Sequence, residues 1–161
     1  MCSALVNVTS FFKTLILQQG AFESLAEYTP DKQFEDTTLF YFYKARAHIA
    51  LGDTESIKHI IPANTENLAL KAVTVFAHYI SAPTAGDAAL EELRDLCVEI
   101  EGDDVEATER EKGWVRVVAG TAFARAGEIE EALETLGAES TTENLEAYVF
   151  FIDLRAFRTG S

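Results

Sequence analysis

Five glycines divide the chain at nearly regular intervals, and this spacing constrains the fold more than any other feature. Gly20, Gly52, Gly86, Gly127 and Gly160 each follow an apolar-periodic stretch and stand 32, 34, 41 and 33 residues apart. A period near 34 residues is typical of stacked helical hairpins. Glycine suits the turns, because the chain leaves the first helix in a left-handed backbone conformation that residues with a Cβ resist. The spacing therefore predicts an all-α solenoid.

Helix-like segments on either side of these glycines predict the units of one superhelical array over residues 1–161. We expect hairpins at about 4–28, 36–61, 66–100 and 113–137, then a lone helix at about 142–158 that opens an unfinished unit 142–161. The acidic segment 101–113 explains the one long spacing, as a surface loop or a frayed helix start. Because one amphipathic hairpin cannot cover its own apolar face, the units must stack on one another.

Composition argues against two classes of partner. The chain has 27 acidic and 13 basic residues and a net charge of −14, so it repels phosphate backbones and lacks a basic stripe for nucleic acid. The longest stretch without Asp, Glu, Lys or Arg is the 15-residue segment Ala72–Gly86, which is too short to insert into a membrane.

Cys2 and Cys97 form no CxxC pair, which favours a reduced, cytoplasmic setting.

The residues that carry chemistry do not form a catalytic or metal-binding pattern. There is no Gly-rich phosphate loop, metalloprotease motif or nucleophile elbow. His48, His59 and His78 are 11 and 19 residues apart, which is not the helical spacing of zinc ligands. Cys97 follows Leu96 on an apolar face and is expected to be an inert core thiol. We therefore predict a protein that is not an enzyme and binds no metal or cofactor.

The strongest motif, residues 119–136, resembles a tetratricopeptide repeat across its helix-turn-helix junction. Gly120 occupies the small position where two helices approach, Phe123 the aromatic slot, Gly127 the turn and Ala132 the second small position. The resemblance implies a superhelix in which the first helix of each hairpin lines a concave groove.

A second copy of the motif precedes it in the chain. Tyr41, Ala45, Gly52 and Ile57 occupy the corresponding positions, although Ile57 departs from the small residue usually found there and Pro62 interrupts the second helix. This unit is expected to be the less regular of the two.

Alignment on the glycines predicts the partner-binding residues of the groove. They are Phe42, Arg46 and Ile49 in the second unit, Trp114, Val117, Thr121 and Arg125 in the fourth, and Phe150, Leu154 and Phe157 in the last helix. In the third unit either Phe76 or His78 could point inward. For each aromatic residue the alternative is burial in the core, where such stripes usually pack. With few basic groups, the groove is expected to prefer an apolar element, such as a hairpin or helix, over an acidic tail.

The order of motifs narrows the resemblance further. The segments Leu39–Gly52 and Leu70–Ile80, followed by the strong repeat, resemble the coatomer epsilon subunit family. The resemblance implies a non-catalytic coat component that clamps the C-terminal domain of the alpha subunit and supports Golgi to endoplasmic reticulum transport. It also implies a cytoplasmic location, peripheral on Golgi membranes and coated vesicles. The alternative is a generic tetratricopeptide adaptor that binds short peptides, or a co-chaperone-like scaffold.

The last predicted helix is apolar over most of its circumference between Leu145 and Phe157. No helix folds back after it within the sequence. We therefore expect the N-terminal part of a longer superhelix, or a face covered by a partner or by a second copy of the chain.

Overall fold

The computed structural model describes residues 23, 26–27, 37–82, 84 and 86–137, and helices are the regular secondary structure in these ranges. They are α2 (Thr37–Ala50), α3 (Ile57–Ile60), α4 (Leu68–Ser81), α5 (Gly86–Glu99), α6 (Glu109–Ala126) and α7 (Ile129–Gly137). The prediction of an all-α fold is confirmed. The predicted hairpin at 4–28 lies mostly outside the described residues, and the final helix lies wholly outside them.

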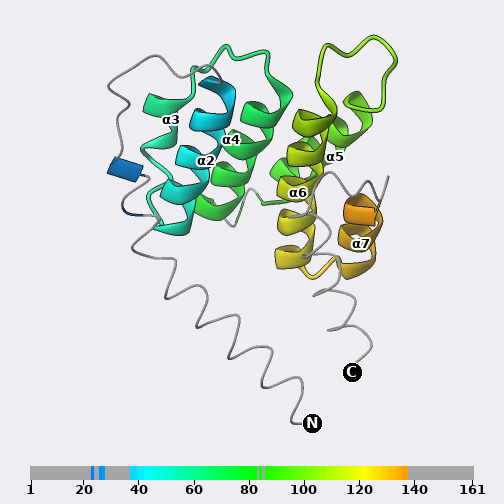
Figure 1. Cartoon of the computed structure of the whole chain (residues 1–161). Helices are drawn as coiled ribbons and strands as arrows, with labels where there is room; N and C mark the ends of the chain where they lie inside the picture. The colour runs from blue at the N-terminus through cyan, green and yellow to red at the C-terminus, as the bar shows by residue number, and fades with distance from the viewer. Residues whose placement is uncertain (1–22, 24–25, 28–36, 83, 85, 138–161) are drawn as a thin grey trace, which may run out of the picture.

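The helices pack as successive hairpins. The first helices form a row in which α4 packs against both α2 and α6, and the second helices α3, α5 and α7 pack against this row. In Figure 1, α2, α3 and α4 occupy the left half of the molecule and α5, α6 and α7 the right half. This arrangement is that of an α-solenoid.

Two of the predicted turns have the expected left-handed glycine. Gly52 follows α2 with φ 78° and Gly127 follows α6 with φ 85°. At the first turn, the Gly52 amide donates to the Ile49 carbonyl at 3.0 Å and the Asp53 amide donates to the His48 carbonyl at 2.9 Å. These bonds satisfy the last carbonyls of the helix in a Schellman motif.

The prediction of the same role for Gly86 is wrong. This glycine has no positive φ and begins α5, where it is buried. A Cβ at this position would lie 3.4 Å from the Tyr79 ring, which is ordinary van der Waals contact, so neither the backbone conformation nor the space around it requires glycine. The α4–α5 connection after Ser81 is instead made by residues 82–85.

The α6–α7 hairpin has the close approach that its motif predicts. A Cβ on Gly120 would lie 2.7 Å from Leu136 Cγ, which is closer than real side chains pack. Phe123 is 1% exposed and Ala132 is fully buried. Helix α7 therefore lies against the backbone of α6 at Gly120.

The acidic segment divides between a turn and a helix. Residues 101–108 connect α5 to α6 as the arch at the upper right of Figure 1, and α6 begins at Glu109, earlier than the expected 113. Thr108 caps α6: its hydroxyl accepts from the Glu111 amide at 3.2 Å, and the Glu111 carboxylate accepts from the Thr108 amide at 2.8 Å. This reciprocal capping box starts the helix before its apolar residues begin.

Helix α3 is much shorter than the other helices. It ends at Ile60, and Ile61 is extended, with φ −108° and ψ 121°. Ile61 precedes Pro62, whose ring disfavours the α conformation in the residue before it. The expected interruption by Pro62 therefore limits α3 to four residues.

Arg94 connects two helices of the second set. From α5 it donates to Glu131 of α7 at 2.6 Å and to Glu128, just before α7, at 2.6 Å, and it also pairs with Glu91. Its guanidinium lies 5.3 Å from the centroid of the buried Phe123 ring of α6. One side chain thus contacts α5, α6 and the start of α7.

Candidate interaction surface

Helix α2 carries four consecutive aromatic residues, Phe40 to Tyr43, and therefore presents rings around most of its circumference. Phe42 is fully buried, whereas Tyr41 and Tyr43 are each 37% exposed. The helix contains no acidic residue. These rings form an aromatic surface on α2, the first helix of the described first-helix row.

Phe42 and Tyr43 meet the single tryptophan of the chain. The rings of Phe42 and Trp114 are stacked with centroids 4.6 Å apart and an interplanar angle of 13°. Tyr43 lies edge-on to both, 5.3 Å from Phe42 and 6.0 Å from Trp114. Offset-stacked and edge-to-face pairs of this kind are favourable beyond the area they bury. The three rings, called here the aromatic cluster, connect α2 to α6.

Two arginines lie over the aromatic cluster. The Arg46 guanidinium is 5.5 Å from the Phe42 centroid and 5.8 Å from that of Tyr43. The Arg110 guanidinium is 5.1 Å from the Trp114 centroid. Each is within the range in which a cation is attracted to a ring face. The aromatic cluster thus has a cation on each of the two helices that build it.

The structure places the predicted groove residues at different depths. Phe42, Trp114 and Val117 are buried, with exposed fractions of 0%, 4% and 2%. Arg46, Ile49 and Thr121 are half-buried, and Arg125 is exposed. Phe150, Leu154 and Phe157 lie outside the described residues. Of the predicted set, Phe42, Arg46 and Trp114 are brought together, and the two rings fill the space between α2 and α6 themselves.

In the third unit, Phe76 and His78 are the two candidates for the inward-facing position, and the structure places them in different environments. Phe76 is 9% exposed and stacks with Tyr79 at 6.4 Å, so it belongs to the core. His78 is exposed and lies on the side of α4 that faces the α2–α3 turn.

Sequence reasoning missed Tyr43 and Arg110 as members of this surface. Arg110 stands four residues before Trp114 on α6, a spacing that puts both side chains on one helix face. That signal was present in the sequence. The position of Tyr43 depends on how α2 and α6 approach each other, which no local pattern encodes.

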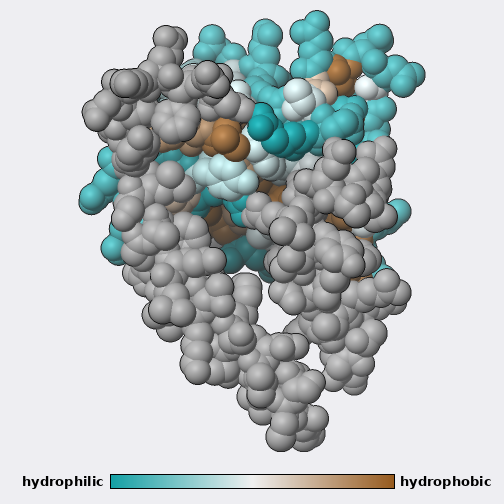
Figure 2. Space-filling model, viewed as in Figure 1, coloured by the Kyte–Doolittle hydropathy of each residue, from teal (hydrophilic) through white to brown (hydrophobic). Residues whose placement is uncertain are grey.

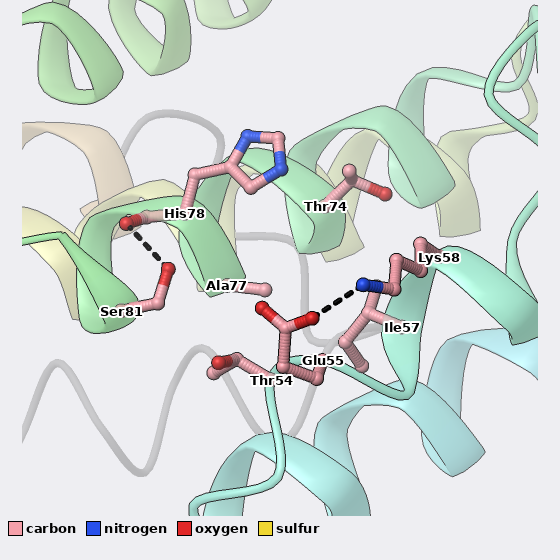
Figure 3. A pocket seen from close by; sticks show the side chains of 8 residues that line it. All are labelled: Thr54, Glu55, Ile57, Lys58, Thr74, Ala77, His78 and Ser81. Carbon is pink, nitrogen blue, oxygen red and sulfur yellow. Dashed lines mark hydrogen bonds and ion pairs between the residues drawn. The ribbon is translucent and has the colours of Figure 1, made fainter.

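A small hollow lies between the α2–α3 turn and α4 (Figure 3). Its volume is about 90 Å³, and its lining consists of Thr54, Glu55, Ile57, Lys58, Thr74, Ala77, His78 and Ser81. Figure 3 shows the ion pair of Glu55 with Lys58 at its edge and the Ser81 hydroxyl donating to the His78 carbonyl. Small-molecule sites are usually about 300 Å³ or more, so the hollow is too small for one.

Cys97 and His48, two side chains that could carry chemistry, make structural contacts in the described part of the chain. Cys97 packs against the core, and burial raises the pKa of its thiol to about 11, which keeps it protonated near neutral pH. The His48 ring lies 2.9 Å from the Asp53 carboxylate within the α2–α3 turn. In the described part of the chain, no three His, Cys, Asp or Glu side chains are grouped to hold a metal ion.

Hydrophilic residues predominate at the top and upper right of Figure 2, where Figure 1 places the α5–α6 arch, with a small hydrophobic patch among them. Among the helices of the described ranges, none is both long and apolar enough to cross a bilayer.

Comparison with the sequence models of known families gives a match over most of the chain. The sequence model of the coatomer epsilon subunit family matches residues 17–159, which is most of the chain. No curated protein and no solved structure matches the chain at a significant level of similarity.

Proposed function

Because the chain belongs to the coatomer epsilon subunit family, a structural subunit of a vesicle coat, we propose that it holds the C-terminal domain of the coatomer alpha subunit through its first-helix row. In this role it supports Golgi to endoplasmic reticulum transport from the cytoplasmic side of Golgi membranes and coated vesicles. It acts by binding another polypeptide and not by catalysis.

The observation that carries this proposal is the aromatic cluster with its two arginines. Phe42 and Trp114 give α2 and α6 a fixed relation, while Tyr43 keeps 37% of its surface exposed beside Arg46. Large aromatic residues and arginine are the side chains most enriched among residues that dominate binding energy at protein interfaces. The predicted groove residues Ile49, Thr121 and Arg125 lie on the same two helices and are half-buried or exposed, whereas Val117 is buried. Phe150, Leu154 and Phe157 stay predictions of the same groove.

The test is co-elution of the full chain with the alpha subunit in high salt, with Tyr43→Ala compared with Tyr41→Ala. The two tyrosines lie on the same helix and have equal exposure, but only Tyr43 contacts Trp114. We expect Tyr43→Ala to weaken binding about thirtyfold, the equivalent of about 2 kcal/mol for an interface anchor. Tyr41→Ala is expected to change it less than threefold.

Equal effects of the two variants would contradict the role of the aromatic cluster. Loss of co-elution of the unaltered chain at moderate salt would contradict an apolar contribution to the interface. If a peptide screen instead returned a short linear motif and the alpha subunit did not bind, the chain would be a peptide adaptor.

A further inference from the structure

The starts of helices α4 and α6 are joined by a hydrogen bond between side chains that are 44 residues apart in the chain. Asn67 Nδ2, at the N-cap of α4, donates to Glu111 Oε1, in the first turn of α6, at 2.6 Å. The orientation of the Asn67 amide follows from its two partners, because the Leu70 amide can only donate to Asn67 Oδ1 and the Glu111 carboxylate can only accept. This hydrogen bond between Asn67 and Glu111 is called here the cap link.

Both partners of the cap link also cap their own helices. Asn67 Oδ1 accepts from the Leu70 amide at 3.1 Å, and Glu111 Oε2 accepts from the Thr108 amide at 2.8 Å. Burial raises the pKa of Glu111, but the hydrogen bonds from Thr108 and Asn67 outweigh it and lower the pKa below its usual value, so the carboxylate is charged at neutral pH. This charge lies beside the N-terminal ends of two helices, where the helix dipoles favour an anion.

The cap link lies one turn from the aromatic cluster, because Glu111 stands three residues before Trp114 on α6. Apolar packing between α4 and α6 is non-directional and permits small shifts along the helix axis, whereas a hydrogen bond requires a defined distance and angle between its atoms. The stack of Trp114 on Phe42, with centroids 4.6 Å apart, is sensitive to such a shift, since α2 and α6 each pack against α4.

We propose that Asn67 and Glu111 are positioning residues of the candidate interaction surface: the cap link fixes how far α6 lies along α4, and this places Trp114 against Phe42. A polar contact that sets the register between packed helices is a well-attested use of such groups. The importance of the cap link for binding rests on the proposed function, but its test uses the chain alone. The inference can therefore hold or fail whether or not the alpha subunit binds.

Exchange of the two groups tests the cap link while keeping both helix caps. Asn67→Asp keeps a good N-cap residue but places two carboxylates against each other. Glu111→Gln keeps a residue that suits the capping box but, with its amide oxygen held by the Thr108 amide, places two NH2 groups against each other. The double variant has the same net charge as the unaltered chain and restores the hydrogen bond with its donor and acceptor exchanged.

Trp114 is the only tryptophan of the chain, so its fluorescence in the folded state reports directly on the aromatic cluster. We expect each single variant to increase acrylamide quenching of Trp114 in the folded full chain. Each should also raise the unfolding equilibrium constant about fivefold, measured by urea denaturation, as is usual for the loss of a hydrogen bond with a charged partner. The double variant should return both quantities most of the way to those of the unaltered chain.

Ser56→Ala is the matched control, because it removes a side-chain hydrogen bond to Asp53 at the α2–α3 turn and leaves the cap link intact. It is expected to lower stability without changing the quenching of Trp114. Single variants that lower stability and leave the quenching unchanged would show that Asn67 and Glu111 only cap their helices, and would overturn the inference. Additive effects in the double variant would do the same, as would an equal increase in quenching in Ser56→Ala.

Discussion

The second and fourth units share one motif and differ in how closely their helices pack. In the fourth, Gly120 and Ala132 let α7 lie against the α6 backbone, and α7 extends over nine residues. In the second, Ile57 stands where the fourth has Ala132, and α3 has four residues before the chain extends toward Pro62. The turn glycines Gly52 and Gly127 are nevertheless alike. Turn geometry is therefore independent of the length and packing of the helix that follows.

The largest expected effect comes from Gly120→Val. Any Cβ there would overlap Leu136, and the buried site leaves little room to adjust. Overpacking of this kind costs about 1–3 kcal/mol, and we expect a loss near the upper end of that range in the free energy of unfolding, measured by urea denaturation. Leu136→Ala made together with Gly120→Val should recover part of the loss. Additive losses in the double variant would contradict a direct clash.

The next effect tests the equivalence of the two turns. Gly127→Val and Gly52→Val introduce a β-branched residue at positive φ, where nothing lies within 4 Å of the new Cβ, so the cost is backbone strain alone. We expect each to lower the free energy of unfolding by about 1–3 kcal/mol. Gly127→Asn and Gly52→Asn should cost less, because asparagine tolerates this conformation. An unchanged melting temperature for either valine variant would refute its turn.

The smallest expected effect concerns the pKa values of Asp53 and Glu128, the residues that directly follow the turn glycines Gly52 and Gly127. Hydrogen bonds from Ser56 and His48 lower the pKa of Asp53, whereas a hydrogen bond with Glu131 raises the pKa of Glu128. Because the folded-state pKa of Asp53 is depressed, its contribution to stability is present above the unfolded value of about 3.9 and lost as the pH falls through the folded value. The effect is small, since the Asp53 side chain is 46% exposed.

Carboxyl chemical shifts across an acid titration would measure both groups. Asp53 is expected to titrate below the ordinary aspartate range, and in Ser56→Ala its midpoint should rise. Glu128 should titrate above the ordinary glutamate range. The reverse order would contradict the hydrogen bonds that set these values.

Sequence patterns predicted the local structure better than the site. The glycine period placed the turns at Gly52 and Gly127, because positive φ is a local requirement that few other residues meet. It failed at Gly86, which has no positive φ and is the first residue of α5, so this glycine begins a helix and does not make the turn before it. The start of α6 at Glu109 was readable from the capping residues Thr108 and Glu111, but the acidic composition of the segment obscured it.

For the site, helical spacing placed Phe42 and Trp114 on the correct helices without showing that they stack on each other. That contact depends on how two helices that both pack against α4 approach each other, and this relation is fixed by the whole array.

The Arg94 contacts affect how the described helices unfold. To separate α7 from its neighbours, the chain must release Glu128 and Glu131 from Arg94 and uncover the Phe123 ring beneath the guanidinium. Local opening of α7 therefore disturbs α5 as well, and backbone amides of the two helices should share one protection class in hydrogen exchange. The third and fourth hairpins then melt as a single cooperative block, although the long arch of residues 101–108 separates them along the chain.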